Sequence, residues 1–127
     1  MTLSKLGNPN AVADRELEVF EATPGVTRVR LDCREFTCRC PLTGQPDWAT
    51  IEIDYVPDGK CIESKSLKLY LETFREEGIF HEALADVIAG DVYEATRARH
   101  VRVTVHFNSR GGIAIEATAE RPPAAAS

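Results

Sequence analysis

The residues best suited to chemistry lie in one short stretch, EFTCRCPLTGQPDWAT, residues 35–50. Cys38 and Cys40 flank a single arginine, and a proline and a Gly-Gln-Pro turn follow before Asp47. Three kinds of chemistry use such residues. They are zinc coordination, disulfide formation, and nucleophilic attack by a thiolate that has a carboxyl group nearby.

The spacing of the cysteines disfavours the first two. Zinc knuckles prefer cysteine pairs with two to four residues between them, whereas a single residue separates Cys38 from Cys40. On an extended strand, the Cα atoms of two such cysteines lie about 6.6 Å apart, near the upper limit for a disulfide. Cys33 and Cys61 could join a metal site only if the fold gathered them, so no metal site is predicted.

A nucleophilic role for Cys40 requires the thiolate form and a proton donor near the group that the sulfur attacks. The turn over residues 43–46 is able to fold Asp47 back towards Cys40, and a carboxyl group placed there can transfer a proton. Residue types alone favour the inert alternative. In that alternative Cys40 is a small buried side chain and Asp47 a turn or cap residue, because most free cysteines are buried and unreactive.

The elements that must position these residues follow from hydrophobic periodicity. Alternating apolar residues predict four strands, over residues 26–33, 49–56, 100–107 and 113–119. Helical spacing predicts two helices, over residues 66–77 and 81–99, with Gly78 just past the end of the first. The order ββααββ predicts an α+β fold, one antiparallel sheet with two helices on one face. The open edges of such a sheet indicate an oligomer.

Length and composition predict an ordinary globular protein. The chain has 127 residues, and we expect a flexible arm over residues 1–14, one domain over 15–119 and a disordered tail over 120–127. The net charge of −5 argues against direct nucleic-acid binding. The sequence has neither the apolar core of a signal peptide nor a run approaching the roughly 18 apolar residues of a membrane span. We therefore expect a cytoplasmic protein with reduced thiols and no membrane association.

A longer segment resembles a known family. Residues 36–82, FTCRCPLTGQPDWATIEIDYVPDGKCIESKSLKLYLETFREEGIFHE, are similar to the NADPH-dependent 7-cyano-7-deazaguanine reductases, the QueF family in its short single-module form. The similarity continues through RGGI, residues 110–113, and so covers most of the chain. The resemblance implies the tunnelling fold, in which ββααββ subunits join their sheets into a multi-subunit barrel. It also implies a homo-oligomer, a decamer of two pentamers with active sites between subunits.

The implied reaction reduces the nitrile of 7-cyano-7-deazaguanine, a deazapurine, to an aminomethyl group with two NADPH, in queuosine biosynthesis for tRNA modification. By resemblance, Cys40 is the nucleophile that forms a covalent thioimide, and Asp47 is the proton donor. The implied substrate-binding residues are Ile62, Glu63, Ser64, His81 and Glu82. The implied NADPH-binding residues are Ser64, Lys65, Arg110 and Gly111. Taken singly, Glu82 would be a common first-turn acid, and Lys65 and Arg110 would be solvated surface charges.

Two other functions compete with this hypothesis. A tunnelling-fold amidinotransferase would share the cysteine thioimide step but use ammonia in place of NADPH, and the segment ESKSLK argues against it. A non-catalytic purine- or pterin-binding module would use Glu82 to hold the ring and leave Cys40 idle. None of these hypotheses gives Cys38 a function.

Overall fold

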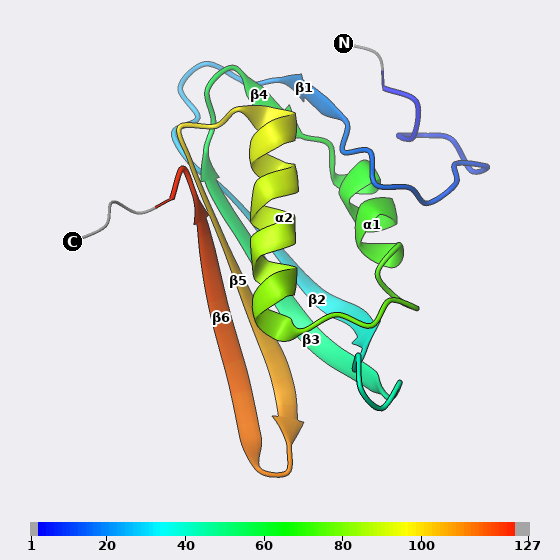
Figure 1. Ribbon diagram of the computed structural model, residues 1–127. Helices are drawn as coiled ribbons and strands as arrows, with labels where there is room; N and C mark the ends of the chain where they lie inside the picture. The colour runs from blue at the N-terminus through cyan, green and yellow to red at the C-terminus, as the bar shows by residue number, and fades with distance from the viewer. Residues whose placement is uncertain (1–2, 124–127) are drawn as a thin grey trace.

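The computed structural model describes residues 3–123. Its elements are β1 (Val19–Glu21), β2 (Val29–Arg39), β3 (Pro46–Val56), β4 (Lys60–Ile62), α1 (Ser64–Glu72), α2 (His81–Thr96), β5 (His100–Arg110) and β6 (Ile113–Arg121). The long strands form one antiparallel sheet in the order β2-β3-β5-β6, and both helices lie on one of its faces (Figure 1). The predicted α+β fold is therefore confirmed. The short strands β1 and β4, which pair with each other, were not predicted.

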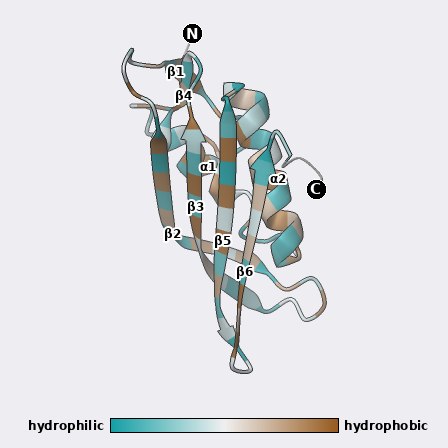
Figure 2. Cartoon of the chain, turned by 90° about the vertical axis from the view of Figure 1, so that its left-hand side faces the viewer, coloured by the Kyte–Doolittle hydropathy of each residue, from teal (hydrophilic) through white to brown (hydrophobic). Residues whose placement is uncertain are grey.

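The alternation of side chains explains why the sheet has one covered face. On β5, the side chains of Val101, Val103 and Val105 are completely buried, whereas Arg102 between them is exposed. Successive residues of a strand point to opposite faces, so the apolar set packs under the helices and the polar set faces outwards. Figure 2 shows the resulting alternation of hydrophilic and hydrophobic residues along the strands.

The first two long strands extend further than predicted, and this places the cysteine motif. Strand β2 continues to Arg39 rather than ending at Cys33, and β3 begins at Pro46. The pairing register shifts between Cys33 and Phe36, which marks a β-bulge. A bulge adds an unpaired residue and breaks the alternation. The sequence pattern therefore stops at the bulge although the strand does not.

Helix α1 begins at Ser64, earlier than predicted, because Glu63 caps it. The Glu63 carboxylate accepts hydrogen bonds from the backbone amides of Lys65 and Ser66, both at 2.7 Å. These amides have no partner inside the helix, so the cap satisfies them. The helix ends at Glu72, well before the predicted end.

The predicted role of Gly78 at a helix end is wrong, because Gly78 lies beside strand β2. The backbone of Arg39 donates to Glu77 at 2.9 Å and accepts from Ile79 at 3.2 Å. A Cβ atom on Gly78 would lie 3.0 Å from the Cα atom of Pro41. Glycine is therefore needed here for close approach to the segment that follows β2.

The ends of the described chain make specific contacts. The backbone amides of Ser4 and Lys5 donate to the Glu18 carboxylate, and Lys5 is buried. Strand β6 pairs Arg121 with Val101, so the sheet extends past residue 119, the predicted end of the domain. The flexibility of residues 1–14 and 120–127 stays a prediction, and residues 124–127 lie outside the described part. Within residues 3–123, no helix is long and apolar enough to cross a membrane.

Candidate active site

Cys40 lies just after strand β2, at the start of the loop to β3. Its backbone amide donates to the Gln45 carbonyl at 2.9 Å, and its carbonyl accepts from the Gly44 amide at 2.9 Å. Gly44 has a φ of 71°, a left-handed conformation that favours glycine. The PLTGQ sequence therefore closes a tight loop that fixes the Cys40 backbone and leaves its side chain half-buried.

Asp47 lies opposite Cys38 in the β2–β3 ladder, and its side chain is only 2% exposed. Cross-strand partners share a face of the sheet, so Asp47 points to the same helix-covered face as Cys38. Cys40 follows one residue after the end of β2, and Arg110 links it to Asp47, because Arg110 interacts with both side chains. Strand pairing, rather than the turn alone, brings Asp47 to this position.

Two further side chains converge on the Asp47 carboxylate. Arg110, at the end of β5, donates from Nη1 to Oδ1 of Asp47 at 2.8 Å. Nε2 of His81, the first residue of α2, lies 3.4 Å from Oδ2 of Asp47. The His81 ring stacks on Phe107, with the ring centroids 3.5 Å apart and an interplanar angle of 6°. This stack fixes the histidine ring towards the carboxylate.

Hydrogen bonds around the sulfur favour the thiolate of Cys40. The Thr43 hydroxyl, the backbone amides of Thr43 and Leu42, and the Arg110 guanidinium lower the pKa of Cys40 from 9.0 to about 7. By contrast, burial first and the Asp47 charge second raise the pKa of Cys38 to about 12. The thiolate of Cys40 is therefore favoured at neutral pH relative to an ordinary cysteine, whereas Cys38 stays a thiol packed in the core.

The structure describes all four cysteines, and all four are free thiols. In the described part of the chain, no group of three or more His, Cys, Asp or Glu side chains is placed to hold a metal ion.

The residues predicted from the ESKSLK segment lie elsewhere. Ile62 and Glu63 are buried, and the Glu63 carboxylate already caps α1. The Lys65 ammonium donates to the Asn8 carbonyl at 2.6 Å, and Ser64 is exposed. This junction between β4 and α1 lies at the opposite end of the molecule from the β2–β3 loop (Figure 1). One chain therefore does not bring the two groups of predicted residues together.

The remaining predicted residues lie near the end of the sheet that carries Cys40. Glu82 is exposed in the first turn of α2, next to His81. Gly111 is in the β5–β6 turn with a φ of 58°. Sequence reasoning gave no role to Thr43, which lowers the pKa of Cys40, or to Gln45, which accepts from Arg110. Their residue types carry no signal beyond that of a turn.

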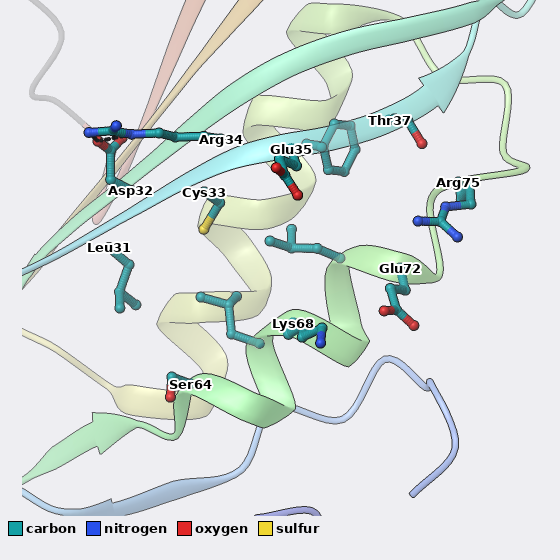
Figure 3. A pocket seen from close by; sticks show the side chains of 13 residues that line it. Leu31, Asp32, Cys33, Arg34, Glu35, Thr37, Ser64, Lys68, Glu72 and Arg75 are labelled. Atoms are coloured by element: carbon teal, nitrogen blue, oxygen red, sulfur yellow. Dashed lines mark hydrogen bonds and ion pairs between the residues drawn. The ribbon is translucent and has the colours of Figure 1, made fainter.

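A groove of about 390 Å³ lies between β2 and α1, apart from Cys40 (Figure 3). Its lining carries three cations, Arg34, Lys68 and Arg75, and three carboxylates, Asp32, Glu35 and Glu72, and Ser64 contributes a hydroxyl group. Apolar lining comes from Leu31, Leu67 and other side chains of the two elements. Cations suit phosphate groups and apolar walls suit ring systems. The groove therefore combines apolar walls with an equal number of cations and carboxylates.

The element order and the four-stranded antiparallel sheet with both helices on one face define a class, the α+β proteins with the subunit arrangement of the tunnelling fold. A family model described as QueF-like protein matches residues 46–125. The chain therefore belongs to the QueF family.

Individual relatives are named consistently. A protein from Frankia casuarinae called NADPH-dependent 7-cyano-7-deazaguanine reductase is 63% identical over 93% of this chain and 94% of its own length. A protein of the same name from Halorhodospira halophila is 50% identical over 78% of this chain and 86% of its own length. Among solved structures, the apo form of the archaeosine synthase QueF-Like superposes with a TM-score of 0.71. It is 27% identical and covers 76% of this chain and 94% of that one.

Proposed function

We propose that this protein is an NADPH-dependent 7-cyano-7-deazaguanine reductase of queuosine biosynthesis. The proposal rests on one observation, the arrangement in which Arg110 joins the half-buried Cys40 to the buried Asp47 carboxylate, 2.8 Å from its guanidinium. Reduction of a nitrile through a cysteine needs a nucleophile for the carbon and a proton for the nitrogen, and this pair supplies both. The 63% identity to a protein named an NADPH-dependent reductase, against 27% to one named an archaeosine synthase, favours NADPH as the second reactant.

In the first step, a bond forms between the Cys40 sulfur and the nitrile carbon, and one carbon–nitrogen π bond breaks. The nitrogen takes a proton from Asp47, which has received it from the Cys40 thiol, so the product is a neutral thioimide. The His81 ring, stacked on Phe107, keeps a nitrogen 3.4 Å from the same carboxylate. This contact holds the carboxyl group in one orientation as its proton moves.

The low pKa of Cys40 serves a second step as well. When the carbon has been reduced, the carbon–sulfur bond must break, and a thiol with a lower pKa is a better leaving group. Bound NADPH supplies hydride, and conversion of a nitrile to an amine takes four electrons, so two cofactor molecules are required. In our proposal Ser64, Lys68 and Arg75 hold the cofactor in the groove between β2 and α1.

The resemblance adds Lys65, Arg110 and Gly111 to the cofactor site, and we retain them as proposals. Both cations have partners in this chain, because Lys65 donates to Asn8 and Arg110 donates to Asp47. Glu82 is exposed in the first turn of α2, where its carboxylate can accept the N–H donors of a deazaguanine ring.

We also propose that the active enzyme is an oligomer, a decamer of two pentamers. Strands β2 and β6 are the edges of the sheet. Among residues 3–123, β6 has no outer partner, and β2 has one at its end alone, where Arg39 pairs with the backbone of residues 77–79. The β4–α1 junction, which carries the predicted substrate residues 62–64, lies at the opposite end of the molecule from the β2–β3 loop (Figure 1). A second copy can bring its own residues 62–64 to Cys40. Light scattering that finds only single chains at working concentration would contradict this part of the proposal.

The test of the proposed function follows NADPH absorbance as 7-cyano-7-deazaguanine is added. We expect two NADPH oxidised for each nitrile, and an amine as the product. Without NADPH, mass spectrometry should detect one covalent adduct per site, lost in Cys40→Ala and retained in Cys38→Ala. If no NADPH is oxidised but ammonia converts the adduct to an amidine, the protein is an amidinotransferase instead.

A further inference from the structure

Arg110 contacts two side chains of the candidate site, Asp47 and Gln45. An arginine that served only to bind a phosphate group would not need these contacts. Strict alternation from Phe107 would place Arg110 on the outer face of the sheet, away from Asp47. The β5–β6 register shifts between Phe107 and Arg110, and such irregularities redirect side chains near active sites. The guanidinium instead reaches Asp47, with Nη1 at 2.8 Å from Oδ1.

Gln45 holds the other side of the same guanidinium. Its side-chain carbonyl accepts from Nη2 of Arg110 at 2.6 Å, while its backbone carbonyl accepts from the Cys40 amide at 2.9 Å. Its own amide donates to the Thr43 hydroxyl oxygen at 3.3 Å. One residue therefore connects the arginine to the loop that carries the nucleophile.

The burial of Asp47 explains why this arrangement persists. The Asp47 side chain is 2% exposed, whereas that of Arg110 is 41% exposed. A buried carboxylate is destabilising unless a charged or hydrogen-bonding partner compensates it. Arg110 is the cation that forms an ion pair with Asp47, and its exposed remainder faces solvent. The buried Asp47 carboxylate is therefore stabilised when the Arg110 guanidinium remains paired with it.

We propose that Arg110 is a positioning residue for Cys40 and Asp47, and that Gln45 holds its guanidinium in place before any cofactor binds. The proposal rests on the proposed function only in naming Cys40 and Asp47 as the catalytic pair. Arg110 also contributes, after Thr43 and Leu42, to lowering the pKa of Cys40. The cation thus favours the thiolate and keeps the neighbouring carboxylate in a fixed orientation.

The test measures the rate of Cys40 alkylation by iodoacetamide against pH, with peptide mass spectrometry to separate the four cysteines. The rate should rise with a midpoint near 7 in the unmodified protein. Arg110→Ala should move the midpoint upwards, because removal of a cation disfavours the thiolate. Each unit of upward shift lowers the ratio of thiolate to thiol about tenfold at a given pH. Gln45→Ala should shift it less, in the same direction.

Arg28→Ala is the matched control, since Arg28 forms an ion pair with Asp54 at 2.8 Å and lies outside the proposed site. Its midpoint should not change. Arg110→Ala leaves the buried Asp47 charge without its ion-pair partner. If this variant fails to fold for that reason, Asp47→Asn removes the charge, and the double variant Arg110→Ala with Asp47→Asn is compared with Asp47→Asn alone. A midpoint unchanged by loss of Arg110 would overturn the proposal.

This experiment uses neither nitrile nor NADPH. An unchanged alkylation midpoint would therefore contradict the role of Arg110 without contradicting the proposed reductase function. A protein that oxidises no NADPH would contradict the proposed function without contradicting the role of Arg110.

Discussion

The loop after β2 makes a quantitative prediction about Cys40. Several groups lower the pKa of Cys40 from 9.0 to about 7, and the Thr43 hydroxyl has the largest effect among them. Thr43→Val removes the hydroxyl group and keeps the shape of the side chain. We expect the pKa of Cys40 to rise by about one unit, since several donors share the full shift. The ratio of thiolate to thiol at a given pH should then fall about tenfold.

The assay is the ultraviolet absorbance of the thiolate, titrated with pH and corrected by subtracting the titration of Cys40→Ala. Because the substitution raises the pKa of Cys40, the difference in thiolate absorbance between the two proteins is confined to a limited range of pH. Well above both pKa values each protein is fully thiolate, so the difference vanishes at high pH and is largest between the two midpoints. The rate of nitrile adduct formation should fall less than the thiolate fraction, because a more basic thiolate is intrinsically more nucleophilic.

Thr43→Ser is the matched control, because it keeps the hydroxyl group at the same position. Its midpoint should stay close to that of the unmodified protein. A Thr43→Val protein with an unchanged midpoint would refute the argument, and so would a serine variant that shifts as far as the valine variant. Either result would mean that the sulfur is not stabilised by this hydroxyl.

Three further predictions concern other residues. Asp47→Asn should slow nitrile adduct formation by about 10²–10⁴-fold, as loss of a general acid does, while thiol alkylation continues; equal losses of both would contradict this. Gly78→Ala should reduce activity, because its Cβ would lie 3.0 Å from a Cα atom of the nucleophile's loop, whereas Gly90→Ala in α2 should keep activity. Glu63→Ala should lower the free energy of unfolding by about 1 kcal/mol through loss of the helix cap, measured in urea, with exposed Glu72→Ala near neutral.

Much of the fold followed from the sequence because side-chain periodicity is local. Val101, Val103 and Val105 alternate with polar residues, and any such segment must form a strand with one buried face. The same pattern failed at Cys33, where the bulge before Phe36 breaks the period although pairing continues. Strands β1 and β4, with three residues each, are too short to show any period.

The sequence also determined which residues could be nucleophile and acid, since only certain residue types perform that chemistry. Residue types and spacing named Cys40 and Asp47 as a possible pair but favoured the inert alternative, because nothing local distinguishes a reactive thiol from a buried one. A single residue separates Cys38 from Cys40 in the sequence, yet the pKa of Cys38 is about 12 and that of Cys40 about 7.

Tertiary structure decided that difference. Cys38 points into the core, where burial disfavours its charge, whereas Cys40 meets the hydrogen-bond donors of its own loop. The side chains that contact Asp47 belong to His81 and Arg110, which are distant from it along the chain. His81 is 34 positions away and Arg110 is 63 positions away. The charge state of a side chain depends on which donors and charges surround it in space. The sequence states the residue types and their order, and only folding brings those groups within hydrogen-bonding distance.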